Sequence, residues 1–344
     1  MSFWHKLSRP IVVLAPMADV TDAPFRKLIA KYSAHTRSDG SVGGPDVMWT
    51  EFVSADGLIR ATPEGKKKLL ADLIFDDSER PIVAQLFSSS PTYMEQAAAL
   101  CRDLGFDGID INMGCPDRSI EKQGCGAAMI KDPDQAAAVI AAAKRGAENL
   151  PVSVKTRLGY NQDQLEEWLP KLLAAEPAVV TVHARTRKEM SKVPARWERI
   201  ARAVEIRDTS GSQTLIFGNG DVHSVEDAHE KARATHADGV MLGRAIFGNP
   251  WLFHLTKRLP ERVAADNNHY YELISVEERL RVMVEHTKLF SELLPHKSFA
   301  VMKKHYKAYV HGFAGAVELR THLMETQSVD QVVTLVDTFL QSRE

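Results

Sequence analysis

Two of the three cysteines lie ten residues apart, in the stretch INMGCPDRSIEKQGCGAAMI. Cys115 and Cys125 have no second cysteine pair to complete a zinc site, and their spacing is not the C-x-x-C of a redox disulfide, although a disulfide remains an alternative. Cys101 lies in a helical pattern, the usual setting of an inert buried thiol. A thiol just past a strand end, beside Asn112, is well placed to give or take a proton, so Cys115 is the candidate catalytic residue.

Polar side chains or glycines end several short β-branched segments, where apolar core residues would be ordinary. Lys155, in VSVKTR, needs an anionic partner if it is buried. A phosphate-bearing cofactor whose ring becomes anionic on reduction would supply one, and pairing with Asp110 or Glu51 is the alternative. For His183 the alternative is a hydrogen-bonded core imidazole. The strand-end residues are Pro16, Met17, Gln85, Asn112, Lys155, Arg157, His183, Arg185, Asn219, Gly220, Asp221, Gly243 and Arg244.

The segments FGNGDV and LGRAIF each place glycine ahead of a predicted helix start. Glycines let backbone N–H groups approach a phosphate, the helix N-terminus adds a favourable dipole, and Arg244 adds positive charge. In eight-stranded α/β barrels a phosphate site commonly follows strands seven and eight. The two segments together therefore indicate a site for a phosphorylated cofactor.

Eight short β-branched or apolar segments alternate with helical patterns along the first three quarters of the chain. This rhythm predicts an α/β fold of the (β/α)8 TIM-barrel type, in which the C-terminal ends of the strands carry the active site. An open doubly wound sheet is the alternative, because periodicity does not reveal closure. The predicted strands are residues 11–16, 47–52, 82–87, 108–113, 152–157, 179–184, 214–219 and 239–244.

After Pro250 the strand signal gives way to four amphipathic segments, which predict a C-terminal helical bundle. Ser275 and Ser328 have the type and position of helix N-caps. The predicted domains are a catalytic barrel, residues 1–255, and a helical domain, residues 256–344. The predicted helices span residues 275–294, 298–313, 315–326 and 328–342.

The net charge is only −2, so a polyanionic partner would need a local basic patch. The stretch HKSFAVMKKHYKAYVH offers one, with two tyrosines, Tyr306 and Tyr309, that could stack on a base. An ordinary solvated face is the alternative. The basic residues are Lys297, Lys303, Lys304 and Lys307.

The 344 residues are 44% hydrophobic and 26% charged, a composition typical of folded globular proteins. The first residues, MSFWHKLSRPIVVLAP, contain too short an apolar run for a signal peptide, and no window resembles a membrane span. With three cysteines, these features predict a protein of the reducing cytoplasm, without membrane or metal partners. We also expect a monomer.

An ordered set of motifs runs from Ala15 to about Phe253: APMADVTDAPFR, TEFVSADGL, AQLF, INMGCP with GCGAAMIKDP, VKTRLGY, VHARTR, GNGDV and GVMLGRAIFGNPWLF. In this order they resemble the tRNA-dihydrouridine synthase family, and KKHYKAYVHGFAGAVELRTHL resembles its C-terminal helical domain. The resemblance implies an FMN enzyme that reduces the C5–C6 double bond of uridines in tRNA, with NADPH or NADH as reductant. It makes residues 1–255 the FMN-binding domain and residues 256–344 the RNA-binding domain.

The resemblance also implies roles for individual residues. Cys115 would protonate uracil C5 after the reduced flavin delivers hydride to C6, since a thiol of ordinary pKa is mostly protonated at neutral pH. The glycine-rich loop would let Cys115 close over a flipped-out base. FMN would contact Pro16, Met17, Gln85, Lys155, His183, Asn219, Gly220, Asp221, Gly243 and Arg244; the base would contact Asn112, Arg157 and Arg185; and RNA would contact Lys297, Lys303, Lys304 and Lys307.

Two other functions fit parts of the sequence. A flavin barrel could reduce a free pyrimidine, as a dihydroorotate dehydrogenase running in reverse would, but a small substrate needs no basic helical domain. A non-catalytic RNA-binding barrel would not need Cys115, Lys155 and the phosphate segments. The chain departs from the family pattern at Ala184 and at residues 88–90, where glycine is more common, and in an insertion around residues 37–45.

Overall fold

The computed structural model describes residues 2–37, 40–259 and 272–343. Its internal contacts divide the chain into two compact units. The first comprises Met1–Ala18 and Asp46–Arg244, and the second comprises Asp19–Pro45 and Ala245–Glu344. Each unit is described by itself. The functional division into a catalytic part, residues 1–255, and an RNA-binding part stays a prediction.

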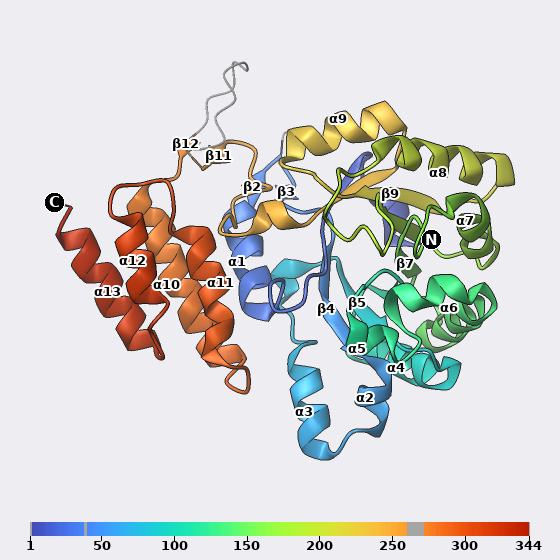
Figure 1. Ribbon diagram of the computed structural model, residues 1–344, viewed down its shortest axis with the longest axis horizontal. Helices are drawn as coiled ribbons and strands as arrows, with labels where there is room; N and C mark the ends of the chain where they lie inside the picture. Colours follow the sequence, from blue (N-terminus) through green and yellow to red (C-terminus); the bar gives the residue numbers. More distant parts are fainter. Residues whose placement is uncertain (1, 38–39, 260–271, 344) are drawn as a thin grey trace. The chain divides into compact units, whose positions relative to one another are not determined.

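The first unit is an eight-stranded parallel barrel (Figure 1). The sheet runs in the order β1-β10-β9-β8-β7-β6-β5-β4. Its two edges are joined by backbone hydrogen bonds from Leu14 N to Val47 O (3.2 Å) and from Asp46 N to Val12 O (2.9 Å). The predicted (β/α)8 fold is therefore confirmed, and the open sheet is excluded. The strands are β1 Ile11–Leu14, β4 Met48–Ser54, β5 Ile82–Phe87, β6 Gly108–Asn112, β7 Val152–Arg157, β8 Val179–His183, β9 Leu215–Asn219 and β10 Gly239–Leu242.

Helices surround these strands, and local sequence explains where several of them begin (Figure 1). The side chains of Ser90, Asp132 and Ser224 each accept a hydrogen bond from a backbone N–H of the first turn, as N-caps do. Gly211 ends one helix in the left-handed conformation. The helices are α2 Ala55–Arg60, α3 Pro63–Ala71, α4 Pro91–Asp103, α5 Arg118–Glu121, α6 Pro133–Ala147, α7 Leu165–Ala174, α8 Trp197–Ser210 and α9 Val225–Thr235.

Side chains alternate along the strands between the helix-facing side and the barrel interior. Outward residues such as Ile109 and Val154 join one apolar cluster with the helices. A second cluster gathers residues from six strands around Trp4, whose ring lies 5.9 Å from that of Trp49 and 5.6 Å from that of Phe217. The interior is therefore closed by hydrocarbon at the N-terminal ends of the strands, which leaves the C-terminal ends for polar residues.

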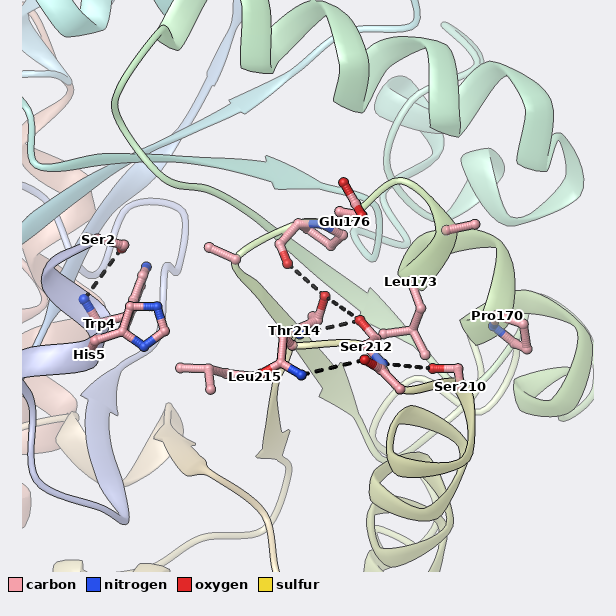
Figure 2. Close-up of a pocket in the computed structure, with 15 residues that line it drawn as sticks. Ser2, Trp4, His5, Pro170, Leu173, Glu176, Ser210, Ser212, Thr214 and Leu215 are labelled. Atoms are coloured by element: carbon pink, nitrogen blue, oxygen red, sulfur yellow. Dashed lines mark hydrogen bonds between the residues drawn. The ribbon is translucent and has the colours of Figure 1, made fainter.

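A cavity of about 620 Å³ lies at these N-terminal ends (Figure 2). Figure 2 shows the hydroxyls of Ser210, Ser212 and Thr214 beside it, and Ser212 Oγ donates to Thr214 Oγ1 at 3.1 Å. Its lining precedes β1, β8 and β9, so the cavity lies at the opposite end of the barrel from the strand-end residues predicted to act.

The second unit contains the predicted C-terminal helices and one helix from the N-terminal part of the chain. Phe25 of that helix stacks on His286, with the rings 4.8 Å apart and 9° from parallel. Ser275 and Ser328 act as N-caps, as predicted. None of the helices in the described ranges is long and apolar enough to span a bilayer. The elements are α1 Ala23–Ser33, β2 His35–Thr36, β3 Val42–Gly43, β11 Lys257–Arg258, β12 Glu272–Leu273, α10 Val276–Leu293, α11 Met302–Tyr309, α12 Ala316–Leu323 and α13 Val329–Gln341.

Candidate active site

Strand register brings the predicted polar residues of β6 to β9 side by side. Asn112 pairs with Lys155, and Arg157 with His183, which in turn pairs with Asn219. Lys155 Nζ donates to Asn219 Oδ1 at 3.3 Å, and Asn219 Nδ2 donates to the carbonyl of Met241 at 2.8 Å. These contacts assemble one site at the C-terminal end of the barrel.

Lys155 and Arg157 lie close enough at this end of the barrel for their charges to repel each other. Within the described ranges, no carboxylate lies within ion-pair distance of Lys155, but the charge of Asp110 is close enough to favour the ammonium form of Lys155. Burial lowers the pKa of Lys155 to about 8, with Arg157 adding repulsion. Burial and the neighbouring cations also hold the pKa of His183 well below its usual value, so its imidazole is neutral. An anionic group bound here would relieve this electrostatic repulsion.

The turn after β9 allows a close backbone approach that only glycine permits. Gly220 has a φ of +121°, and a Cβ atom there would lie 2.9 Å from the Cβ of Ala195. The next residue, Asp221, accepts the Ala195 N–H at 2.9 Å and pairs with both Arg185 and Arg244. Its Oδ1 lies 2.6 Å from Arg244 Nη2, and these bonds lower the pKa of the carboxyl. Asp221 therefore holds Arg244 at the predicted phosphate site.

The end of β1 lies beside the end of β10. A Cβ atom built on Gly243 would lie 3.6 Å from the Sδ of Met17 and 3.6 Å from the Cβ of Ala15. Pro16 and Met17 are both half-buried. The structure thus brings these predicted cofactor residues to the same end of the barrel as Lys155.

The loop that carries Cys115 is anchored at several atoms. Asn112 Oδ1 accepts the N–H groups of Gly114 (3.1 Å) and Cys115 (2.9 Å), and the Cys115 carbonyl accepts the Ala127 N–H (2.9 Å). A Cβ atom on Gly114 would lie 3.2 Å from the backbone of Thr156. At Gly114 the missing Cβ therefore permits tight packing on β7, and closure of this loop over a base stays a prediction.

The Cys115 thiol is half-buried beside a small apolar cluster formed by Phe87, Ile120 and Cys125, with Phe52 packed against it. Burial raises the pKa of Cys115 above its ordinary value, so the thiol keeps its proton at neutral pH. All three cysteines are free, which excludes the disulfide between Cys115 and Cys125. Cys101 is fully buried in α4, as its helical pattern predicted.

The two arginines predicted to face the base are largely buried and hydrogen-bonded to loop backbone. Arg157 donates from Nε to the Gly114 carbonyl at 2.7 Å and from Nη1 to the carbonyls of Thr186 (3.2 Å) and Met190 (3.3 Å). Arg185 is 2% exposed and donates to the Val193 carbonyl at 2.6 Å. Arg157 thus holds the loops after β6 and β8, Arg185 holds the loop after β8, and their contact with a base stays a prediction.

Sequence reasoning missed one feature of this site and named another only as a possible ion-pair partner. Arg187 forms a bidentate ion pair with Glu121 of α5, with its Nε 2.7 Å from Glu121 Oε1, which ties the loop after β8 to the Cys115 loop. Asp110 is fully buried, and its carboxylate accepts a hydrogen bond from the side-chain amide of Gln85, another predicted site residue. The sequence analysis named Asp110 only as a possible partner of Lys155; an acidic residue in the middle of the apolar segment GIDINM was the signal that it needs hydrogen-bond donors from neighbouring strands.

The predicted RNA-binding lysines lie in the second unit and differ in their surroundings. Lys297 and Lys304 lie 3.9 Å and 3.5 Å from the carboxylate of Asp19. Lys303 is half-buried and Lys307 is exposed, and neither has an acidic partner within ion-pair distance in the described part of the chain.

The expectation that Tyr306 and Tyr309 stack on RNA is wrong, because both side chains are fully buried. They form one face of α11 with Met302 and His305, and that face packs in the core of the helical unit.

The fold and the site define a (β/α)8-barrel protein with a basic, anion-accepting mouth and an anchored, protonated thiol. The model of the family "Dihydrouridine synthase (Dus)" matches residues 13–344. The chain belongs to this family.

Curated relatives match along almost the whole chain. A Staphylococcus epidermidis protein named "Probable tRNA-dihydrouridine synthase" is 38% identical over 341 residues, which cover 98% of this chain and 96% of the relative. The Bacillus subtilis protein named "Probable tRNA-dihydrouridine synthase 2" is 38% identical over 339 residues, with the same coverage of 98% and 96%.

The fold is also similar to that of solved structures. A 2-naphthoyl-CoA reductase in complex with 2-naphthoyl-CoA superposes with a TM-score of 0.52 at 11% identity, over 71% of this chain and 49% of that chain. This chain thus spans about half the length of that protein, and the likeness concerns the fold.

Proposed function

We propose that this protein reduces uridines in tRNA to 5,6-dihydrouridine, with FMN as the bound redox group and NADPH as the source of electrons. Family membership and the names of the relatives support the reaction. The observation that carries the site assignment is the protonated Cys115 thiol, held by Asn112 at the cationic end of the barrel.

The residues at the mouth suit a flavin mononucleotide. Lys155 is a half-buried cation with no carboxylate within ion-pair distance in the described ranges, and it would compensate negative charge on the reduced ring. When bound, the flavin supplies the hydride that reduces uracil C6. The ring would be lined by Pro16, Met17, Gln85, Lys155 and His183, and the phosphate by Asn219, Gly220, Gly243 and Arg244, with Asp221 orienting Arg244.

Cys115 would hold the proton that C5 needs. Its Sγ keeps that proton at neutral pH because burial raises the pKa of the thiol. Backbone bonds from the loop to Asn112 and Arg157 fix where the thiol stands. Asn112, Arg157 and Arg185 are the residues proposed to meet the base, which must leave the RNA stack to reach the barrel mouth. The protein's part is therefore placement and proton supply.

The helical unit would bind the RNA backbone. Lys303 and Lys307 lie one turn apart on α11, and both are free of acidic partners within the described ranges. Lys297 and Lys304 would add less positive charge, because both lie near the Asp19 carboxylate. Contacts of this kind would offset the few kcal/mol needed to extrude a base.

A direct test compares substrates on the holoenzyme. We expect yellow purified protein to form dihydrouridine, measured by mass spectrometry, in unmodified tRNA with NADPH, and to leave free uracil and uridine unchanged. Reduction of the free pyrimidine at an equal or higher rate would support the dihydroorotate dehydrogenase-like alternative instead. A colourless protein that binds tRNA without reducing it would support the non-catalytic alternative.

A further inference from the structure

A carboxylate is buried in the barrel wall beneath the candidate catalytic loop. Asp110 lies in the middle of β6 and is 0% exposed. Its Oδ2 accepts a hydrogen bond from Gln85 Nε2 at 2.7 Å, and its Oδ1 accepts one from Ser153 Oγ at 2.6 Å. A buried carboxylate is unfavourable unless such donors surround it, so these bonds define how the neighbouring side chains are oriented.

The hydrogen bonds continue from Asp110 toward the thiol. Asn112 Nδ2 donates to Gln85 Oε1 at 3.3 Å, and Asn112 Oδ1 accepts the backbone N–H groups of Gly114 and Cys115. Gln85 is 1% exposed and Asn112 is 7% exposed, so little water competes for these groups. The chain thus runs from Asp110 through two side-chain amides to the backbone of Cys115.

The two ends of this chain fix its direction. An ionised carboxylate only accepts hydrogen bonds, and a backbone N–H only donates. Gln85 must therefore turn its NH2 group toward Asp110 and its oxygen toward Asn112. Asn112 must then turn its NH2 group toward Gln85, which leaves its oxygen for the loop. Any inversion of either amide would place two donors or two acceptors against each other.

We infer that Asp110 is a positioning residue, which fixes the amides of Gln85 and Asn112 and thereby holds the Cys115 loop in place for proton transfer. The inference rests on the proposed function for the role of Cys115. Asp110 itself is fully buried and acts through Gln85 and Asn112.

Protonation of Asp110 would remove this constraint. Burial raises the pKa of Asp110 to about 6, while Gln85, Ser153, Lys155 and Trp49 lower it. Lys155 is the charged group among these neighbours. A protonated carboxyl can donate to Gln85, so that both amides can invert and turn the NH2 group of Asn112 toward the loop N–H groups. The loop should therefore loosen as the pH falls below about 6.

The test measures the loop directly by the rate at which iodoacetamide alkylates Cys115 in the holoenzyme, followed by mass spectrometry. Asp110→Leu removes the acceptor, and we expect Cys115 to react at least about fivefold faster and kcat on tRNA to fall at least about tenfold. Asp110→Asn carries both a donor and an acceptor, as the protonated carboxyl does, so at pH 7.5 it should reproduce to within about threefold the alkylation rate and the kcat that the parent protein shows well below pH 6.

The pH dependence of kcat provides a second measurement, which would not change if Asp110 only stabilised the fold. In the parent protein, kcat should fall below about pH 6 as Asp110 becomes protonated, and Asp110→Asn should lack this acidic limb. Ser153→Ala is the matched control: it removes one hydrogen bond from the same carboxylate but leaves the bond to Gln85. In Ser153→Ala, Cys115 should still be alkylated slowly. The fall in kcat at acidic pH should begin at a higher pH than in the parent protein, because Ser153 lowers the pKa of Asp110.

Parent-like alkylation in Asp110→Leu would overturn the inference, whatever its turnover. If that variant does not fold, Gln85→Leu breaks the same chain and should accelerate alkylation equally; parent-like alkylation there would also overturn it. Failure of the proposed function can be distinguished from failure of this inference. A parent protein that forms no dihydrouridine would refute the proposed function, but Cys115 would still be alkylated faster in Asp110→Leu than in the parent protein.

Discussion

The ammonium of Lys155 and the thiol of Cys115 are the two groups whose protonation states shape the site. Burial acts on them in opposite directions: it lowers the pKa of Lys155 to about 8 and raises that of Cys115. A nucleophilic cysteine needs the reverse, since its thiolate must form near neutral pH. The surroundings of Cys115 therefore suit a proton donor.

At Lys155 we expect the substitution Lys155→Met to weaken FMN binding about tenfold, because the buried cation near the anionic cofactor is lost. The parent protein should lose affinity as the pH rises above about 8, where free Lys155 gives up its proton, and the variant should lose less. Fluorescence titration of the apoprotein with FMN between pH 7 and 10 measures both. Lys171→Met, on the exposed part of α7, is the control. Equal affinity and equal pH dependence in Lys155→Met and the parent would remove Lys155 from the cofactor site.

Among the elements, the loops after β6 and β8 are tied together more firmly than a glycine-rich sequence suggests. Arg157 bonds to carbonyls of both loops, and Arg187 joins Glu121 across them. Arg187 also lies over the ring of Tyr160, 5.1 Å from its centroid. These contacts keep the Cys115 loop in a fixed relation to the barrel rim before any substrate binds.

In the helical unit, α10 and α11 enclose two neutral histidines. His286 and His305 are fully buried, with ring centroids 4.5 Å apart, and Phe25 and Tyr309 lie against them. Burial lowers the pKa of His305 to about 3 and that of His286 well below its usual value, with Lys304 and Asp19 as the charged neighbours of His305.

Because the unfolded chain binds these protons near pH 6.5 and the folded chain does not, stability should fall as the pH drops below about 6.5. Between pH 7 and 5 the loss should be about 2 kcal/mol for each histidine. Hydrogen exchange of α10 and α11 peptides, corrected for intrinsic rates, measures this local change. His305→Phe should reduce the pH dependence by about half, whereas His322→Phe, exposed on α12, should not. An unchanged dependence in His305→Phe would contradict the assignment.

The surface of α11 provides the second prediction at this scale. We expect Lys303→Glu with Lys307→Glu to weaken tRNA binding about tenfold and to lower the salt slope of log K by roughly one to two, because phosphate contacts are lost. Lys6→Glu with Lys171→Glu changes the net charge equally, on exposed residues near the N-terminal ends of the strands. Filter binding over a range of salt concentrations compares the two. A similar loss of tRNA affinity in both double variants would show that the effect comes from the change in net charge and would contradict a specific contact at α11.

For the whole molecule, the sequence predicted the barrel well because buried parallel strands are continuous β-branched runs. Strands β5 and β7 coincide with their predicted ranges, and the others differ by one to two residues at their ends. Closure was not predictable from periodicity, since it rests on hydrogen bonds between Leu14, Val47 and their neighbours at the two sheet edges.

The parts of the site that sequence reasoning missed depend on neighbours from other strands. Asp110 meets Gln85 and Ser153 because of the register of β5, β6 and β7, which no single segment specifies. The burial of Tyr306 and Tyr309 was foreseeable, because Met302, Tyr306 and Tyr309 follow helical spacing and so mark an apolar face. Local chemistry was therefore easier to predict than the contacts that position it.

The central claim is that the Cys115 thiol protonates a uracil reduced at the barrel mouth. The most direct measurement mixes anaerobically reduced holoenzyme with unmodified tRNA in a stopped-flow spectrometer and follows reoxidation of the flavin. For Cys115→Ala we predict normal flavin content and normal reduction by NADPH, but reoxidation by tRNA at least about 100-fold slower than in the parent protein, the usual size of a lost general acid. Cys125→Ala, in the same loop, should reoxidise at nearly the parent rate. Equal rates in Cys115→Ala and the parent protein would contradict the account.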